Sequence, residues 1–175
     1  WLAGLRCLVY IPETYHTVRL KEMDHFNAEI IRTAGTYEDT VRESSLSAEQ
    51  HQWYDANPGG VNAPLQTSAY AQIADEIYDQ LRDVPKCVAV PVSNGTLLAG
   101  IYRGFVSLYK RGKTSRIPLL IAGSAAHKNP IIASFRAGLD HCRDIDPVKV
   151  KETAINEPLI NWHSFDGEDA LYAIR

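Results

Sequence analysis

The stretch from Val90 to Gly100 reads VPVSNGTLLAG and joins a short apolar strand to a helix. The run Cys87 to Val92 is almost continuously apolar, which predicts a strand buried on both faces. Ser93-Asn94-Gly95-Thr96 then forms a turn of small residues, and the spacing after it predicts a helix to about Gly112. The apolar face of that helix is predicted to comprise Leu97, Leu98, Ile101, Phe105 and Leu108.

This turn has the chemistry of an anion-binding site. The first backbone N–H groups of a helix have no partner within the helix, and its dipole is positive there. Gly95 can adopt positive φ, Asn94 tolerates left-handed geometry, and Ser93 and Thr96 carry hydroxyl donors. The sequence therefore predicts that Ser93, Asn94, Gly95 and Thr96 bind a phosphate group. A capped strand–helix turn without any ligand explains the same residues and stays open at this point.

The chain on either side of the turn alternates between helices and strands. Leu65, Ala69, Ile73, Ile77 and Leu81 recur every four residues and predict a long helix. Downstream, the pattern predicts a strand over 117–123, a helix over 129–139, irregular chain over 140–162 with a helical turn after Pro147, and a helix with Asp166 as its N-cap. This order is typical of an α/β fold with parallel strands.

The N-terminal part repeats the alternation on a smaller scale. Strands are expected over 6–12 and 28–33, and helices over 17–26 and 37–45. Turn signals follow in Trp53 to Pro64, which reads WYDANPGGVNAP. We therefore expect a partial small domain over 1–52 and a partial large domain over 53–175.

Composition excludes several classes of protein. The 175 residues carry a net charge of -3, which argues against a phosphate-backbone binder of the nucleic-acid kind. No apolar run approaches the roughly 20 residues of a membrane span. The three cysteines, Cys7, Cys87 and Cys142, are odd in number and far apart, so we expect free thiols and a reducing, cytoplasmic location. Cys7 and Cys87 are expected to pack as small hydrophobic residues.

The segment VAVPVSNGTLLAGIYRGF (88–105) resembles the cofactor-phosphate loop of pyridoxal-phosphate enzymes of the tryptophan synthase β-subunit and threonine synthase type, called fold type II. Residues 4–13 and 28–41 resemble the small domain of that family, 53–60 its return to the large domain, and 157–175 a later part of the large domain. The resemblance implies a parallel-sheet three-layer sandwich and pyridoxal 5'-phosphate as the cofactor. It also implies amino-acid metabolism, with β- or γ-elimination or replacement on an amino-acid substrate.

The resemblance also implies that this chain is a fragment with no catalytic residue of its own. In the family, the lysine that forms the Schiff base lies in an earlier segment, and the group that faces the pyridine nitrogen lies further towards the C-terminus. Lys128 follows a predicted strand but matches no motif, so it is expected to be a surface residue. We therefore expect the chain alone to be inactive, and we expect exposed sheet edges to favour a homodimer.

The sequence also contains features typical of other functions. A shortened, non-catalytic homologue that binds a phosphate ligand or a protein partner remains the alternative. The histidines show no HExxH spacing that would suggest zinc. Ser124 lacks the glycines of a GxSxG elbow, and Gly112-Lys113-Thr114 lacks the upstream glycine and strand of a P-loop. Asp55 and Asn57 are expected to be turn formers.

Overall fold

The computed structural model describes every residue except 1, 16–19, 148–152, 154–155 and 157–158. The chain divides into two compact units, which extend to Asn57 and from Pro58 to Arg175. The boundary expected from the sequence, between residues 52 and 53, lies a little before this division. Each unit is described by itself below.

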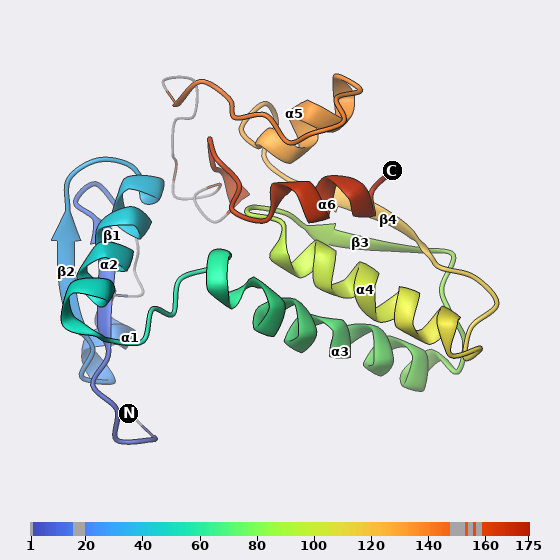
Figure 1. Ribbon diagram of the computed structural model, residues 1–175, viewed down its shortest axis with the longest axis horizontal. Helices are drawn as coiled ribbons and strands as arrows, with labels where there is room; N and C mark the ends of the chain where they lie inside the picture. Colours follow the sequence, from blue (N-terminus) through green and yellow to red (C-terminus); the bar gives the residue numbers. More distant parts are fainter. Residues whose placement is uncertain (1, 16–19, 148–152, 154–155, 157–158) are drawn as a thin grey trace. The chain divides into compact units, whose positions relative to one another are not determined.

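The first unit is a βαβ arrangement followed by a longer helix (Figure 1). Its elements are β1 (Leu8–Pro12), α1 (Leu20–His25), β2 (Glu29–Thr33) and α2 (Tyr37–His51). The two strands pair in parallel, with Leu8 opposite Glu29 and Pro12 opposite Thr33. Parallel pairing requires a crossover between the strands, which α1 supplies.

Helix α2 continues well past the end that the sequence pattern predicts. A capping box starts it, because the Thr36 hydroxyl accepts from the Asp39 amide and the Asp39 carboxylate accepts from the Thr36 amide. The helix ends where Gln52 takes a left-handed conformation with φ of 57°. The sequence pattern predicted this helix only over 37–45, before a polar stretch, but polar residues on an exposed helix face do not stop a helix.

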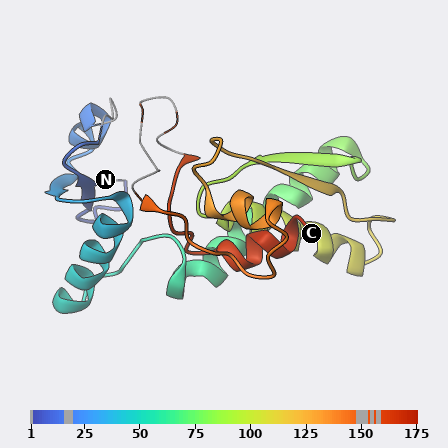
Figure 2. The same ribbon diagram turned by 90° about the horizontal axis from the view of Figure 1, so that it is seen from above.

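The second unit contains a second parallel strand pair that packs against helices (Figures 1 and 2). Strand β3 pairs in parallel with β4, with Cys87 opposite Leu119 and Pro91 opposite Gly123. An α/β architecture with parallel strands, as expected from the sequence, is therefore confirmed. The elements are η1 (Gly60–Asn62), α3 (Ala63–Leu81), β3 (Cys87–Pro91), α4 (Thr96–Lys110), β4 (Leu119–Gly123), α5 (Pro130–Arg136) and α6 (Gly167–Ala173).

Helix α4 forms the centre of the core of this unit, and it contacts α3, α6 and both strands. Of its predicted apolar face, Leu98, Ile101, Phe105 and Leu108 are buried, and Leu97 is half-buried. They pack with side chains from the strands, α5 and α6, among them Val90, Leu120, Ile131 and Leu171. This packing holds the start of α4 in place at the end of β3.

Helix α3 packs against α4 through small residues, and this differs from the predicted stripe. Within that stripe, Ile73 and Ile77 are partly buried against the core, but Leu65, Ala69 and Leu81 are exposed. The fully buried residues of the helix are Thr67 and Ala74. On α4, the facing positions are Gly100 and Gly104. A stripe of small residues lets two helix backbones approach closely, so the buried face of α3 does not coincide with its most hydrophobic face.

The strand pair is buried on one face only. Val90 and Leu120 are buried, but Leu119 and Ile121 are 66% and 47% exposed. Alternate residues of a strand point to opposite faces, so the exposed set lies on one side of the pair. The prediction that both faces of 87–92 are buried is therefore wrong for this chain, and Cys7 and Cys87 are likewise exposed rather than packed.

Two features near the C-terminus complete the unit. The expected helical turn after Pro147 falls on residues outside those described. Asp166 occupies the N-cap position of α6 as predicted, but its side chain makes no capping hydrogen bond. Within the described ranges, no helix is both long enough and apolar enough to cross a membrane.

Candidate functional site

The junction between β3 and α4 is the candidate site, because it lies at the carboxyl end of a parallel strand. The strand pairing continues past Pro91, since the Val92 amide donates to the Gly123 carbonyl oxygen at 2.7 Å. Gly95 has φ of 99° and precedes the first residue of α4, Thr96. In open α/β sheets, ligands bind outside the carboxyl ends of the strands.

The backbone donors at this helix start are available. The first amide of this turn to find a partner is that of Ala99, which donates to the Gly95 carbonyl oxygen at 3.0 Å. Among the described residues, none accepts a hydrogen bond from the amides of Thr96, Leu97 or Leu98. The Ser93 hydroxyl also has no partner in the described part of the chain. These donors and the positive end of the helix dipole suit an anion.

Gly95 is required by packing against neighbouring helices. A Cβ at this position would lie 2.6 Å from the Cβ of Ala170 in α6 and 2.9 Å from Cδ1 of Ile131 in α5. The sequence suggested that the glycine lets a ligand approach. In the structure, the side on which a Cβ would project is filled by the protein itself, and the positive φ adds to the demand for glycine.

Two buried asparagines support the turn, and the sequence analysis missed both. Asn129 is 1% exposed, and its side-chain amide nitrogen lies 3.3 Å and 2.9 Å from the carbonyl oxygens of Val92 and Ser93. The same nitrogen lies 2.8 Å from Oδ1 of Asn161, whose own amide nitrogen lies 3.5 Å from Oδ1 of Asn94. Buried polar groups of this kind need full hydrogen bonding, so the pair constrains the shape of the turn.

Both asparagines have further bonds that hold their side chains in position. The Asn129 side-chain oxygen accepts from the amides of Ile131 and Ile132 and so caps α5. Asn161 donates to the Ser164 hydroxyl at 2.6 Å. An Asn before a Pro at 129–130 is a capping signal that could have been found in the sequence. The contact with Asn161 could not, because it joins segments 32 residues apart.

Asp166 meets the turn from the other side. The Thr96 hydroxyl donates to its carboxylate, and the Asp166 amide donates to the Asn94 carbonyl oxygen at 3.3 Å. Thr96 was expected to offer its hydroxyl to a ligand, whereas here that donor is bonded within the protein. Burial raises the pKa of the Asp166 carboxyl, the charge of Asp169 raises it further, and the bond from Thr96 opposes the rise.

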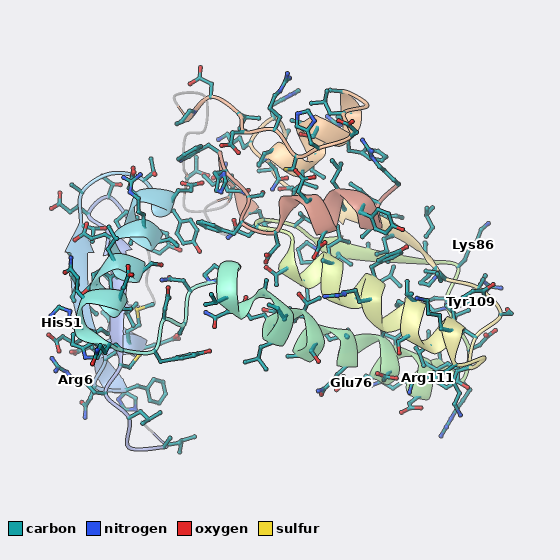
Figure 3. The ribbon with its side chains drawn as sticks, viewed as in Figure 1. Arg6, His51, Glu76, Lys86, Tyr109 and Arg111 are labelled. Atoms are coloured by element: carbon teal, nitrogen blue, oxygen red, sulfur yellow. The ribbon has the colours of Figure 1, made fainter. Side chains whose placement is uncertain are left out.

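Among the residues that the structure describes, several basic side chains lie far from the site. Figure 3 shows Lys86, Tyr109 and Arg111 at the end of the unit where α4 terminates. Helix α4 has 15 residues, so its two ends are about 22 Å apart. Lys128 is half-exposed, and its carbonyl oxygen accepts from the Asn161 amide at 3.1 Å. The Ser124 hydroxyl donates to the Leu159 carbonyl oxygen at 2.8 Å.

The residues present therefore fit a phosphate group through backbone donors. Three amides of Thr96, Leu97 and Leu98 and the Ser93 hydroxyl supply the donors, while Asn129 and Asn161 hold the turn. Within the described ranges, no cluster of three His, Cys, Asp or Glu side chains could hold a metal ion.

Comparison with known proteins shows which family the chain resembles. The family described as pyridoxal-phosphate dependent enzyme matches residues 2–170. Threonine synthase of Methanocaldococcus jannaschii is 29% identical over 153 residues, which cover 86% of this chain and 36% of that protein. Diaminopropionate ammonia-lyase of Escherichia coli is 29% identical over 114 residues, which cover 61% of this chain and 29% of that protein. The chain thus spans about a third of the length of these relatives.

Solved structures show the same fold. Diaminopropionate ammonia-lyase of Escherichia coli, in complex with an aminoacrylate-PLP azomethine intermediate, aligns with a TM-score of 0.73 at 20% identity, over 97% of this chain and 43% of that chain. The processed form of threonine deaminase isoform 2 from Solanum lycopersicum aligns with a TM-score of 0.72 at 15% identity, over 97% of this chain and 45% of that chain.

Proposed function

Because the chain belongs to the family of pyridoxal-phosphate dependent enzymes, we propose that Ser93, Asn94, Gly95 and Thr96 form its phosphate-binding turn. The observation that carries the proposal is the set of unpartnered amides from Thr96 to Leu98 at the end of a parallel strand. The Ser93 hydroxyl adds a side-chain donor to these amides. Gly95 and Asn94 shape the backbone, and the Thr96 amide contributes while its hydroxyl bonds to Asp166.

The proposed activity of the whole protein is that of a lyase or synthase resembling threonine synthase, which carries out β- or γ-elimination or replacement on an amino acid. Relatives named threonine synthase and diaminopropionate ammonia-lyase support this class of chemistry. When bound, pyridoxal phosphate supplies an electron sink that stabilises negative charge developing on the substrate. The part of this chain is to hold the phosphate end of the cofactor, and so to fix the orientation of its ring.

We further propose that no lysine among residues 1–175 forms the covalent bond to the cofactor, so that this chain alone is inactive. Lys86 lies at the far end of the unit, away from the turn (Figure 3). Lys128 is nearer, but it is the backbone of this residue that contacts the site, through Asn161. Lys149 and Lys151 lie outside the described residues.

Binding of pyridoxine 5'-phosphate to the chain tests the proposed turn. This ligand carries the phosphate but no aldehyde, so surface lysines do not capture it. We expect measurable binding by isothermal titration calorimetry, and no binding of pyridoxine, which lacks the phosphate. Ser93→Ala should weaken binding about tenfold, because a hydrogen bond to a charged group is lost. Ser107→Ala, an exposed position on α4, is the matched control and should not change the affinity.

One result would contradict the proposed phosphate-binding turn. Equal affinity for pyridoxine and its phosphate ester would show that the turn does not recognise phosphate.

The claim that no lysine of this chain bonds to the cofactor has its own test. The chain is mixed with pyridoxal phosphate, reduced with borohydride and digested for peptide mapping. Stoichiometric labelling of a single lysine would show that the chain does carry the covalent site.

We also propose that the isolated chain forms a homodimer. The exposed face of the β3–β4 pair presents Leu119 and Ile121, which are apolar and accessible to water. Burying such a face stabilises association. Sedimentation velocity should show a dimer, and Ile121→Lys should shift it towards monomer. A monomer at high protein concentration would contradict the proposal.

A further inference from the structure

The carboxylate of Asp166 occupies a position at the candidate site that an anionic ligand would favour. It accepts the hydrogen bond of the Thr96 hydroxyl, the first side chain of α4. Its own amide donates to the Asn94 carbonyl oxygen at 3.3 Å, so Asp166 contacts the turn on both sides of Gly95. Thr96 and Asp166 are 70 positions apart in the chain, and their contact brings a negative charge to the positive end of a helix dipole.

No cation neutralises this carboxylate within the described part of the chain. No described Lys, Arg or His lies within ion-pair distance of Asp166. Instead, the Asp169 charge lies near enough to disfavour its ionised form. Asp166 also lines a pocket of about 300 Å³ together with Asp144, His163, Glu168 and Asp169. The surroundings are therefore acidic, and a second anion at the turn would meet repulsion.

We propose that Asp166 is an internal competitor that lowers the affinity of the β3–α4 turn for dianionic ligands and makes this affinity depend on the charge of its carboxyl group. The inference rests on the proposed function, since it assumes that the free amides bind a phosphate. An anionic ligand that binds those amides comes close to the Asp166 carboxylate, which accepts the hydrogen bond of Thr96, and is repelled by its negative charge. Neutralising Asp166 removes that repulsion and releases the Thr96 hydroxyl as a further donor.

This competition predicts a direction for the pH dependence. The pKa of the Asp166 carboxyl is raised, chiefly by burial, so this group becomes neutral at a higher pH than an exposed aspartate. Anion affinity should therefore rise as the pH falls through that range. His163, which is 2.9 Å from Asp144, and the carboxylates of Glu168 and Asp169 line the same pocket as Asp166. The Asp166→Asn variant separates the contribution of Asp166 from theirs.

The experiment compares the wild-type chain with Asp166→Asn, and with Asp169→Asn as the matched control. Both variants remove one negative charge from the same helix end, but among the described residues it is Asp166, and not Asp169, that is hydrogen-bonded to Thr96 and Asn94. The probes are pyridoxine 5'-phosphate and sulfate, which stays dianionic across the range tested. Affinities are measured by isothermal titration calorimetry near pH 8 and near pH 5. Thermal unfolding by circular dichroism checks that each variant is folded.

We expect Asp166→Asn to bind pyridoxine 5'-phosphate about tenfold more tightly than wild type at the higher pH, and Asp169→Asn to stay within about twofold. Wild type should bind sulfate more tightly near pH 5 than near pH 8. In Asp166→Asn, this difference in affinity should be smaller. Should Asp166→Asn fail to fold, Asp166→Ser, which retains a short polar side chain, replaces it in the same comparison.

The outcomes separate this inference from the proposed function. If wild type and Asp166→Asn bind the phosphate probe equally, the turn binds phosphate but Asp166 does not compete, and the inference is overturned. Weaker binding by Asp166→Asn overturns it as well, since Asp166 would then support the turn. If no variant binds either probe, the proposed function fails, and the inference fails with it.

Discussion

Replacing Gly104 with alanine is expected to lower the free energy of unfolding of the second unit by about 3 kcal/mol or more. A Cβ at this position would lie 2.3 Å from the Ala71 carbonyl oxygen and 2.7 Å from the Cβ of Ala74. Neither atom can rotate away, because one belongs to the backbone and the other is the only side-chain carbon of a fully buried residue. Helices α3 and α4 would have to separate, and the core around Phe105 would lose contacts along with them.

Urea denaturation followed by circular dichroism measures this effect. Gly123→Ala is the control, because the same added carbon would meet only the Val90 carbonyl oxygen, at 3.7 Å. We expect the control to change the free energy of unfolding by less than about 1 kcal/mol. Equal stability of Gly104→Ala and wild type would show that α3 and α4 do not pack as closely as described.

Asn129→Ala is expected to lower the free energy of unfolding by about 4 kcal/mol. The substitution removes the cap of α5, and a lost cap typically contributes about 1 kcal/mol. It also leaves the Val92 and Ser93 carbonyl oxygens and Oδ1 of Asn161 without their shared donor. Each buried polar group left without a partner costs about 1–3 kcal/mol, and the site has little room to compensate because Asn129 is 1% exposed.

Asn129→Ser separates the contribution of the α5 cap from that of the hydrogen bonds to the turn and to Asn161. A serine hydroxyl keeps the cap of α5, but it is too short to reach the turn and Asn161 together. We therefore expect a smaller loss of stability than for Asn129→Ala, together with weakened binding of pyridoxine 5'-phosphate in calorimetry. If Asn129→Ser and wild type have the same stability, the buried network does not support the turn and the capping role alone remains.

Much of the fold follows from local pattern. The apolar strand 87–91, the small-residue turn and the amphipathic helix from Thr96 are contiguous in the chain, so their periodicity reveals them. The buried face of α4 was predicted correctly at Leu98, Ile101, Phe105 and Leu108. The parallel pairing of β3 and β4 also follows, because a helix between two strands supplies the crossover.

Elements whose environment depends on distant segments were predicted less well. The predicted stripe of α3 is exposed at Leu65 and Leu81. Ile73 and Ile77 pack against the core, but the closest contact with α4 is made by small residues. Strand β3 was expected to be covered on both faces, but continuous hydrophobicity does not show which neighbours are present. Helix α2 extends to His51 because polar composition does not end a helix.

The candidate site, like the fold, was predictable from the sequence only in part. The prediction that Ser93 to Thr96 bind a phosphate rests on a strand that runs into a helix, because helix starts leave amides unpaired wherever they occur. That Asn129 and Asn161 brace the turn, and that the Asp166 carboxylate bonds to Thr96, could be learned only from the folded chain. The physical reason is that these contacts join residues 32 to 70 positions apart, and periodicity carries no information about which side chains meet across such distances.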